Sequence, residues 1–355
     1  MQNAFVYNSN PNRVIFGFGT RDRLAEEADR LGIKKAIVLA TSNQKEDAKM
    51  LSSLLGNRVA AEYHGATMHT PVDITNQAIE IVKKNNVDGI ISIGGGSSTG
   101  LGKALALRTD FPQIVLPTTY AGSEMTPILG ETENGEKKTI SSHKVLPEVV
   151  IYDVELTLTL PVALSGTSGI NAIAHAVEAL YARDKNPITD LLAIEAISSL
   201  SKALPIIAND PNNAEARAGA LYGAWLCGTC LGSVGMSIHH KLCHTLGGLF
   251  NLPHAETHTV ILPHALAYNA SSIPDVMKQI NNCLKSNDSA LSLYELAGEI
   301  GAPRSLKELG MIETNISLAV ERALANPYWN PRPLIKEDIL QLITRAYFGE
   351  PPFAK

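Results

Sequence analysis

Histidines are concentrated in one short stretch of this sequence. The chain contains ten histidines, and six fall between residues 239 and 264: His239, His240, His244, His254, His258 and His264. His240 and His244 are four residues apart and share one helix face, and His254 follows a proline that can begin the next helix. Asn171 and His175 have the same spacing in an earlier helical segment. Such imidazoles predict either a metal site or a metal-free site for acid–base chemistry and anion binding.

A single histidine in an apolar helix is usually a core residue whose hydrogen bonds are satisfied. Several at helical spacing, on two segments that are otherwise apolar, favour convergence on one site. The candidate catalytic residues are therefore Asn171, His175, His240, His244 and His254.

Four further residues near this set each have two possible roles. Glu256 and His258 either belong to the site or form part of the first turn of a helix. Lys241 and Arg332 either contact a carboxylate of the substrate or, as long cationic side chains usually do, lie in solvent.

A glycine-rich loop, "ISIGGGSSTGLGK" at 91–103, lies between a predicted strand and a predicted helix. Backbone amides at a helix N-terminus bind phosphates. The loop lacks the spacing of G-x-G-x-x-G and the G-K-[ST] of a P-loop. It is either a pyrophosphate-binding loop or a tight turn in which glycines serve only geometry. Its candidate cofactor contacts are Gly94, Gly95, Gly96, Ser97, Ser98 and Thr99.

Neutral residues follow the first long predicted strand, at the usual place of an acidic residue that binds the ribose of NAD. Thr41, Ser42 and Asn43 offer no carboxylate. If Thr41 and Asn43 contact the cofactor, they discriminate little against a 2′-phosphate, and NADH or NADPH would serve. The alternative is that they cap the helix that follows.

Composition limits the function classes. With 355 residues, 45% of them hydrophobic, the chain can bury two domain cores. The net charge of −5 argues against nucleic acid or an anionic membrane as the main partner. No leader-like start or run of eighteen apolar residues is present, which favours a cytoplasmic protein. Cys227 and Cys230 lie in an apolar helical segment, where packing is favoured over redox or metal chemistry.

Two halves of the chain have different patterns. Apolar runs at 35–41, 88–94, 113–119 and 148–153 alternate with amphipathic segments, as in a parallel sheet with crossover helices. After residue 153 helical spacing dominates. We predict an α/β domain over 1–157 and an α-helical domain over 158–355, and a ligand shared by both would lie in the cleft between them.

Several motifs, in order, give the sequence a resemblance to the iron-containing (group III) alcohol dehydrogenase family. They are "GGGSSTGLGKA", "LPTTYAGSEMT", "LPEVVIYD", "GINAIAHAVEA" and "HKLCHTLGGLFNLPH". The resemblance implies an N-terminal dinucleotide-binding α/β domain with a parallel sheet and an all-α C-terminal domain, as also in dehydroquinate synthase. It implies cofactor contacts at Thr118, Thr119 and Lys138, and a homodimer.

The departures from the family pattern concern the metal. Metal-dependent members carry an aspartate where this chain has Gly100, and they hold the ion with one Asp and three His. Those four positions are here Asn171, His175, His240 and His254. Because an amide lacks the charge of a carboxylate, we expect no catalytic metal.

These departures, together with "PHAETH" at 253–258, are similar to the maleylacetate reductase branch of the family. That resemblance implies NADH- or NADPH-dependent reduction of the C=C bond of a small dicarboxylate, maleylacetate, to 3-oxoadipate in aromatic-compound degradation. The alternatives are a Fe- or Zn-dependent alcohol or polyol dehydrogenase, a lyase resembling dehydroquinate synthase, and a non-catalytic NAD-binding sensor. The cost of keeping a buried polar cluster argues against the sensor.

The expected chemistry is conjugate hydride addition to an enone. Charge then develops on an enolate oxygen, which imidazole donors can stabilise without a Lewis acid. His244, His254 or water would supply the proton, and Asn171 would avoid the repulsion that an aspartate would cause.

Overall fold

The computed structural model describes residues 5, 7, 9, 10, 12–133 and 136–353. The chain divides into two compact units, one formed by Ser9–Leu160 and the other containing Pro161–Lys355. The predicted boundary at residue 157 is the last residue of the 3-10 turn Val154–Thr157, shortly before this division.

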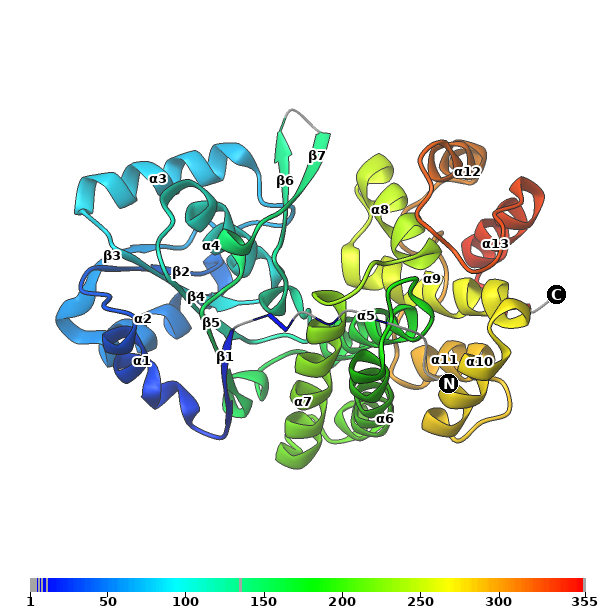
Figure 1. Ribbon diagram of the computed structural model, residues 1–355, viewed down its shortest axis with the longest axis horizontal. Coiled ribbons are helices and arrows are strands. Elements are labelled where there is room, and N and C mark those ends of the chain that lie inside the picture. The colour runs from blue at the N-terminus through cyan, green and yellow to red at the C-terminus, as the bar shows by residue number, and fades with distance from the viewer. Residues whose placement is uncertain (1–4, 6, 8, 11, 134–135, 354–355) are drawn as a thin grey trace. The chain divides into compact units, whose positions relative to one another are not determined.

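A parallel sheet forms the centre of the first unit (Figure 1). Its strands, in the spatial order β1-β8-β5-β4-β2-β3, are Arg13–Gly17, Val149–Asp153, Gln113–Pro117, Gly89–Gly94, Ala36–Leu39 and Val59–Tyr63. Four of them are the predicted apolar runs, and they are buried on both faces because helices cover each side. The predicted parallel sheet is confirmed, whereas β1 and β3 lacked a clear signal in the sequence.

Helices lie on both faces of this sheet. They are α1 Leu24–Arg30, α2 Lys45–Leu55, α3 Val72–Asn85 and α4 Gly96–Thr109. Along β4, Ile91 and Ile93 pack with residues of α1 and α2, whereas Ile90 packs with residues of α3 and α4. Alternate side chains of a strand point to opposite faces, so one short apolar strand contributes to two cores.

A two-stranded antiparallel hairpin completes the first unit. It consists of β6 Ile128–Glu133 and β7 Glu136–Ser141. Its strands carry charged and polar residues at most positions, and the apolar periodicity used to predict strands therefore missed it.

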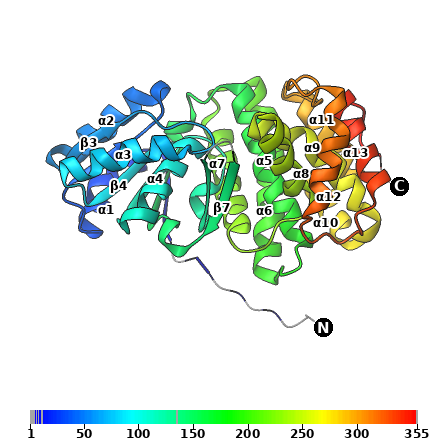
Figure 2. The same ribbon diagram turned by 90° about the horizontal axis from the view of Figure 1, so that it is seen from above.

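The second unit is built from helices, as predicted (Figure 2). They are α5 Val162–Tyr181, α6 Pro187–Asn209, α7 Ala214–Leu231, α8 Ile238–Phe250, α9 His254–Asn269, α10 Pro274–Leu284, α11 Ser289–Glu299, α12 Ile316–Ala325 and α13 Lys336–Phe348. From Ser165 to Tyr181, α5 is buried along its whole length, and it packs against α6, α7 and α9. The helix α8 packs on α9. Polar side chains on the packed faces of α5, α8 and α9 therefore lie inside the bundle.

By length and composition, α6 could cross a membrane, and it is the only helix among the described residues that could. Core helices of a bundle pass the same test. This helix carries Asp190, Glu195 and Lys202 and packs against α5 and α7, as a bundle helix does.

Cys227 and Cys230 are free, fully buried thiols of α7. Burial raises the pKa of the Cys230 thiol to about 12, so it is protonated at neutral pH. Both therefore act as small apolar core residues, which agrees with the packing role predicted for them.

Candidate active site

The glycine loop lies where β4 ends and α4 begins. Gly94 has a φ of 137°, and a Cβ there would come within 2.7 Å of the Ser98 hydroxyl oxygen. A Cβ at Gly95 would lie 2.9 Å from the Thr119 hydroxyl oxygen, whereas nothing outside its own helical turn, in the part of the chain that the structure describes, lies within 4 Å of a Cβ at Gly96. The first turn of α4 is therefore open at Gly96, as a helix N-terminus that binds phosphate must be.

Gln44 joins the predicted cofactor segments of two strands. Its side-chain nitrogen donates to the Thr118 hydroxyl at 2.9 Å, and its oxygen accepts from the Thr41 hydroxyl at 3.2 Å. The Thr118 amide donates to the Gly94 carbonyl at 3.0 Å. Since β2, β4 and β5 are adjacent and parallel, their carboxyl ends meet at one edge, where α/β sheets bind ligands. The sequence alone did not single out Gln44.

The other predicted cofactor residues of this unit are placed as follows. Asn43 is exposed in the turn before α2, Ser97 is half-buried, and Ser98 and Thr99 are buried in the first turn of α4. Lys138 lies on β7, where its exposed ammonium pairs with Glu133 at 3.0 Å.

A buried lysine anchors the segment that follows Thr118 and Thr119. The Lys103 ammonium, at the centre of α4, donates to the carbonyls of Ser123, Thr126 and Ile128 at 2.5, 2.7 and 2.9 Å. Burial lowers the pKa of Lys103 to about 7. These bonds fix the backbone beyond β5 against the helix that begins at the glycine loop.

Thr70 explains why position 100 holds a glycine. A Cβ on Gly100 would collide with the Thr70 hydroxyl. Thr70 itself has a φ of 45°, in the left-handed region, and its carbonyl accepts from the Thr132 amide of β6 at 3.2 Å. This loop thus places the Thr70 side chain in the space that the Cβ of an aspartate at position 100 would need.

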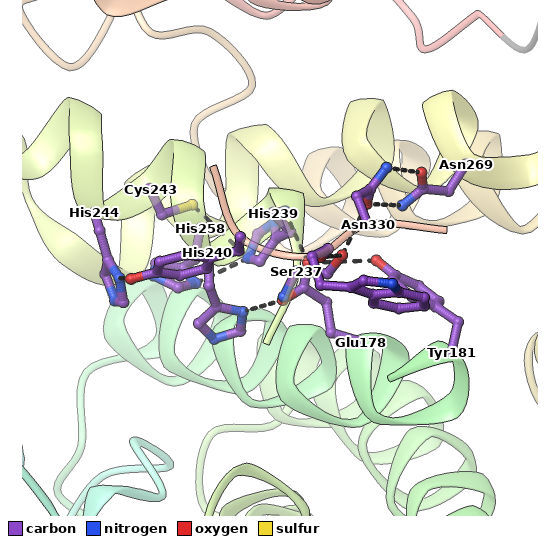
Figure 3. Close-up of polar contacts among 12 residues, drawn as sticks. Glu178, Tyr181, Ser237, His239, His240, Cys243, His244, His258, Asn269 and Asn330 are labelled. Carbon is purple, nitrogen blue, oxygen red and sulfur yellow. Dashed lines mark hydrogen bonds and ion pairs between the residues drawn. The ribbon is translucent and has the colours of Figure 1, made fainter. Parts of the chain in front are cut away.

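The second unit brings the predicted histidines together, and Figure 3 shows His240 and His244 among them. Asn171 and His175 lie on α5, His240 and His244 on α8, and His254 at the start of α9. The ring centroid of His240 lies 5.1 Å from that of His175 and 6.0 Å from that of His244. Asn171, His175 and His240 are buried, whereas His244 and His254 are exposed.

His258, which the sequence left undecided, is buried inside this cluster. Its ring lies 4.3 Å from that of His254 and 5.0 Å from that of His240. His239 joins it, because its Nε2 atom lies 2.9 Å from Nδ1 of His258. Sequence reasoning missed His239, whose position beside His240 in one helical turn does not tell which way its ring points.

Glu178 organises the start of α8 and was also missed. Its carboxylate is fully buried and accepts hydrogen bonds from the backbone amides of Ser237 and His239, each at 2.7 Å. It also accepts from Nδ1 of His240 at 2.7 Å (Figure 3). A carboxylate at the positive end of a helix is favourable, and here it also fixes the orientation of an imidazole.

Three buried imidazoles are held neutral. Burial lowers the pKa of His175, His239 and His258 well below the usual 6.5, and the neighbouring imidazoles of the cluster lower each pKa further. At neutral pH these rings therefore offer one N–H donor and one lone pair each, and no positive charge.

A loop between α12 and α13 closes one side of the cluster. The Tyr328 hydroxyl lies 3.1 Å from Nδ1 of His244, and the Lys241 ammonium lies 5.5 Å from the Tyr328 ring centre. Ser237 donates to the carbonyl of Trp329 at 2.7 Å. Asn330 exchanges two hydrogen bonds with Asn269 (Figure 3).

Arg332 has a different role from the one considered for it. Its guanidinium pairs with Asp338 at 2.7 Å and donates to the carbonyl of Tyr268 at 2.8 Å. It also lies over the Tyr268 ring. These contacts make it a structural group of the C-terminal helices.

The family positions for a metal carry an amide and three imidazoles and no anionic donor. The Asn171 Oδ1, His175 Nδ1 and His240 Nε2 atoms are buried without a hydrogen-bond partner among the described residues. Asn171 brings no negative charge. In the part of the chain that the structure describes, the one group of three His, Cys, Asp or Glu ligand atoms within 4.8 Å of one another is His239, Cys243 and His258. The donors at the family positions thus lack the anionic ligand of metal-dependent members, which lowers their affinity for iron or zinc.

Residues 11–154 match the family described as iron-containing alcohol dehydrogenase, and residues 165–347 match the C-terminal part of the Fe-containing alcohol dehydrogenase family. The chain belongs to the iron-containing alcohol dehydrogenase family. The family and the fold class expected from the sequence are thereby confirmed. The chain is accordingly a nicotinamide-dependent oxidoreductase.

Relatives within the family are similar over nearly the whole length. The maleylacetate reductase of Rhizobium sp. strain MTP-10005 is 53% identical, over 98% of this chain and 99% of its own. The crystal structure of maleylacetate reductase from Agrobacterium tumefaciens is 52% identical, covers 99% of this chain and 100% of its own, and has a TM-score of 0.95. An iron-containing alcohol dehydrogenase from Corynebacterium glutamicum is 38% identical over 98% of both chains, with a TM-score of 0.93.

Proposed function

We propose that this member of the iron-containing alcohol dehydrogenase family is a maleylacetate reductase that works without a catalytic metal. It reduces the C=C bond of maleylacetate with NADH or NADPH to give 3-oxoadipate, a step in the breakdown of aromatic compounds. Full-length similarity to maleylacetate reductases supports this reaction. The protein acts in the cytoplasm as a homodimer.

The neutral donor set of the histidine cluster carries the proposal. An alcohol dehydrogenase of this family uses its ion as a Lewis acid on an alcohol or carbonyl oxygen. Here Asn171 replaces the anionic ligand, and His175 and His258 are buried and neutral. Such a site stabilises a developing enolate by hydrogen bonds, and a substrate with two carboxylates meets no buried negative charge from Asn171.

The reduced nicotinamide supplies the hydride, which adds to the alkene carbon β to the ketone. The π electrons then move toward the ketone oxygen and form an enolate, whose charge the imidazole donors hold. One proton must reach the neighbouring carbon. His244 and His254 are exposed members of the cluster and can exchange protons with solvent, so they are the residues best placed to supply it.

Neutral groups at the ribose end of the cofactor site favour use of both cofactors. Thr41 and Gln44 are held by their mutual hydrogen bond, and no carboxylate lies in the turn Ser42–Gln44 to repel a 2′-phosphate.

Turnover of maleylacetate tests the proposal. The purified protein is assayed for maleylacetate-dependent oxidation of NADH and of NADPH, with and without a chelator, and 3-oxoadipate is identified as product. We expect turnover with both cofactors that the chelator leaves unchanged. Absence of turnover contradicts the substrate assignment, and loss of activity on chelation, together with oxidation of alcohols, favours a metal-dependent alcohol dehydrogenase.

A further inference from the structure

His258 and His239 form a buried pair that the positions of the family's metal ligands do not include. Both side chains are fully buried, and one hydrogen bond of 2.9 Å joins Nε2 of His239 to Nδ1 of His258. Each ring keeps a second nitrogen, Nδ1 of His239 and Nε2 of His258, without a hydrogen-bond partner among the described residues. Buried polar atoms of this kind call for a partner or a functional reason.

The hydrogen bond leaves two possible arrangements of the protons. Either His239 donates from Nε2, and His258 then carries its hydrogen on Nε2, or His258 donates from Nδ1 and its Nε2 is bare. The Glu178 carboxylate already occupies the positive end of α8, so the helix field does not choose between the two arrangements. The first arrangement places an N–H on Nε2 of His258, which has no hydrogen-bond partner among the described residues, and it is the arrangement that a developing oxyanion requires.

The free N–H of His258 lies among the catalytic candidates. Its ring is 4.3 Å from that of His254, 5.0 Å from that of His240 and 6.4 Å from that of His175, measured between centroids. His240 has the opposite arrangement, because Glu178 accepts the hydrogen of its Nδ1. The hydrogen on Nδ1 of His240 is thus directed at Glu178, whereas the Nε2–H of His258 has no partner among the described residues.

We propose that His258 is a further catalytic residue, whose Nε2–H donates a hydrogen bond to the enolate oxygen that forms during hydride addition, and that His239 is the positioning residue that holds this N–H in place. The proposal rests on the proposed function. His258 keeps its proton throughout, since the proton that completes the reaction goes to carbon from another group. Its burial and its hydrogen bond to His239 hold the ring in a fixed position from which it donates to the oxyanion.

Cys243 provides the matched control. Its sulfur lies 3.8 Å from Nε2 of His239, and with the two imidazoles it could instead hold a soft metal ion. The hydrogen bond between the imidazoles needs no ion and no thiolate, and burial raises the pKa of the Cys243 thiol well above its ordinary value. The two explanations therefore differ in what they expect of Cys243→Ala.

The kinetic test uses the full-length protein with maleylacetate. His258→Leu should lower kcat about 100-fold with little change in KM, as removal of one oxyanion donor does. His258→Gln, whose amide can donate, should recover part of that loss. His239→Leu should lower kcat about tenfold and His239→Gln less, because an amide N–H can still reach His258. Cys243→Ala should leave kcat unchanged.

The spectroscopic test needs no substrate and no variant activity. Histidine ring ¹⁵N shifts of the wild-type protein, assigned through His258→Gln, should show hydrogen on Nε2 of His258 and none on Nδ1. A bare Nε2 overturns the proposal, as does an unchanged kcat in His258→Leu. A Cys243→Ala variant that loses bound metal and activity together also overturns it. If wild-type protein does not reduce maleylacetate, the proposed function fails, and the ring shifts still decide whether His258 is a donor.

Discussion

The Nδ1 atom of His240 donates its hydrogen to the fully buried carboxylate of Glu178 at 2.7 Å. Two backbone amides of the turn into α8 bind the same carboxylate. One side chain on α5 thus caps a neighbouring helix and fixes the orientation of an imidazole in the active site. A change at Glu178 should therefore affect both the stability of the helical bundle and the orientation of the His240 ring.

Replacing Glu178 should affect both stability and activity. Glu178→Ala leaves two buried amides and an imidazole unpaired, and we expect a loss of about 3 kcal/mol in the free energy of unfolding. Glu178→Gln keeps the volume and one acceptor, so it should fold better and still lower kcat, because the amide can turn its NH₂ toward His240. Urea unfolding and steady-state kinetics measure both effects. A Gln variant with wild-type kcat would show that the carboxylate does not position His240.

The close approach of Thr70 to Gly100 predicts that alanine at position 100 destabilises the protein and that a second change, at Thr70, restores its stability. Replacing an exposed glycine inside a helix by alanine ordinarily stabilises the protein by about 1 kcal/mol. Here Gly100→Ala should destabilise by about 2 kcal/mol, because the new Cβ meets the Thr70 hydroxyl. Thr70→Gly, which also suits the positive φ at that position, should restore stability in the double variant. Additive losses in thermal unfolding would contradict this account.

Gly96, which lies in the same helix α4, provides the control for the change at Gly100. Since nothing outside its own helical turn, among the described residues, lies within 4 Å of a Cβ there, Gly96→Ala should not lower stability. It should raise the KM for NADH and NADPH, because the methyl group occupies space that the pyrophosphate needs. An unchanged cofactor KM would show that phosphate does not bind in front of Gly96.

Restoring a carboxylate at position 171 tests the electrostatic argument. Asn171→Asp places a negative charge beside His175 in a buried site. We expect kcat/KM for maleylacetate to fall at least about tenfold through repulsion of the dianion, and retention of Zn²⁺ or Fe²⁺ to rise. Asn171→Leu, which removes the polar atom without adding charge, is the control. Improved reduction of maleylacetate by the Asp variant would contradict the argument.

The buried histidines predict acid sensitivity of the fold. Burial, with a contribution from Arg345, lowers the pKa of His264 from 6.5 to about 4. Between these values the unfolded chain binds a proton that the folded chain does not. The free energy of unfolding should therefore fall as pH decreases from 6.5 to 4, by roughly 3 kcal/mol from this group. Urea unfolding at several pH values measures the slope, and His264→Leu should reduce it; an equal slope in the variant would contradict this assignment.

Local patterns in the sequence were enough to predict much of this protein. The apolar run that ends at Gly94, followed by glycines and a helix, predicted both β4 and the opening of α4. The four-residue spacing of His240 and His244 placed both on one helix. These features depend on residues that are neighbours in the chain, so propensity and periodicity are sufficient to find them.

The remaining parts depend on contacts between distant residues. Gln44 binds Thr118 across two strands, and Glu178 binds His240 across two helices. Nothing in the local sequence of either donor or acceptor specifies its partner. His239 was missed for the same reason, since tertiary packing decides where its ring points. The hairpin β6–β7 was missed because its strands are mostly polar.

Metal analysis of active protein tests the central claim most directly. Purified enzyme is dialysed against a chelator, its metal content is determined by elemental analysis, and its reduction of maleylacetate is measured on the same sample. The account predicts full activity at far less than one Fe or Zn per chain, because the amide and imidazoles of Asn171, His175, His240 and His258 carry the chemistry. An activity that disappears with the metal and returns with one equivalent of Fe²⁺ or Zn²⁺ would contradict it.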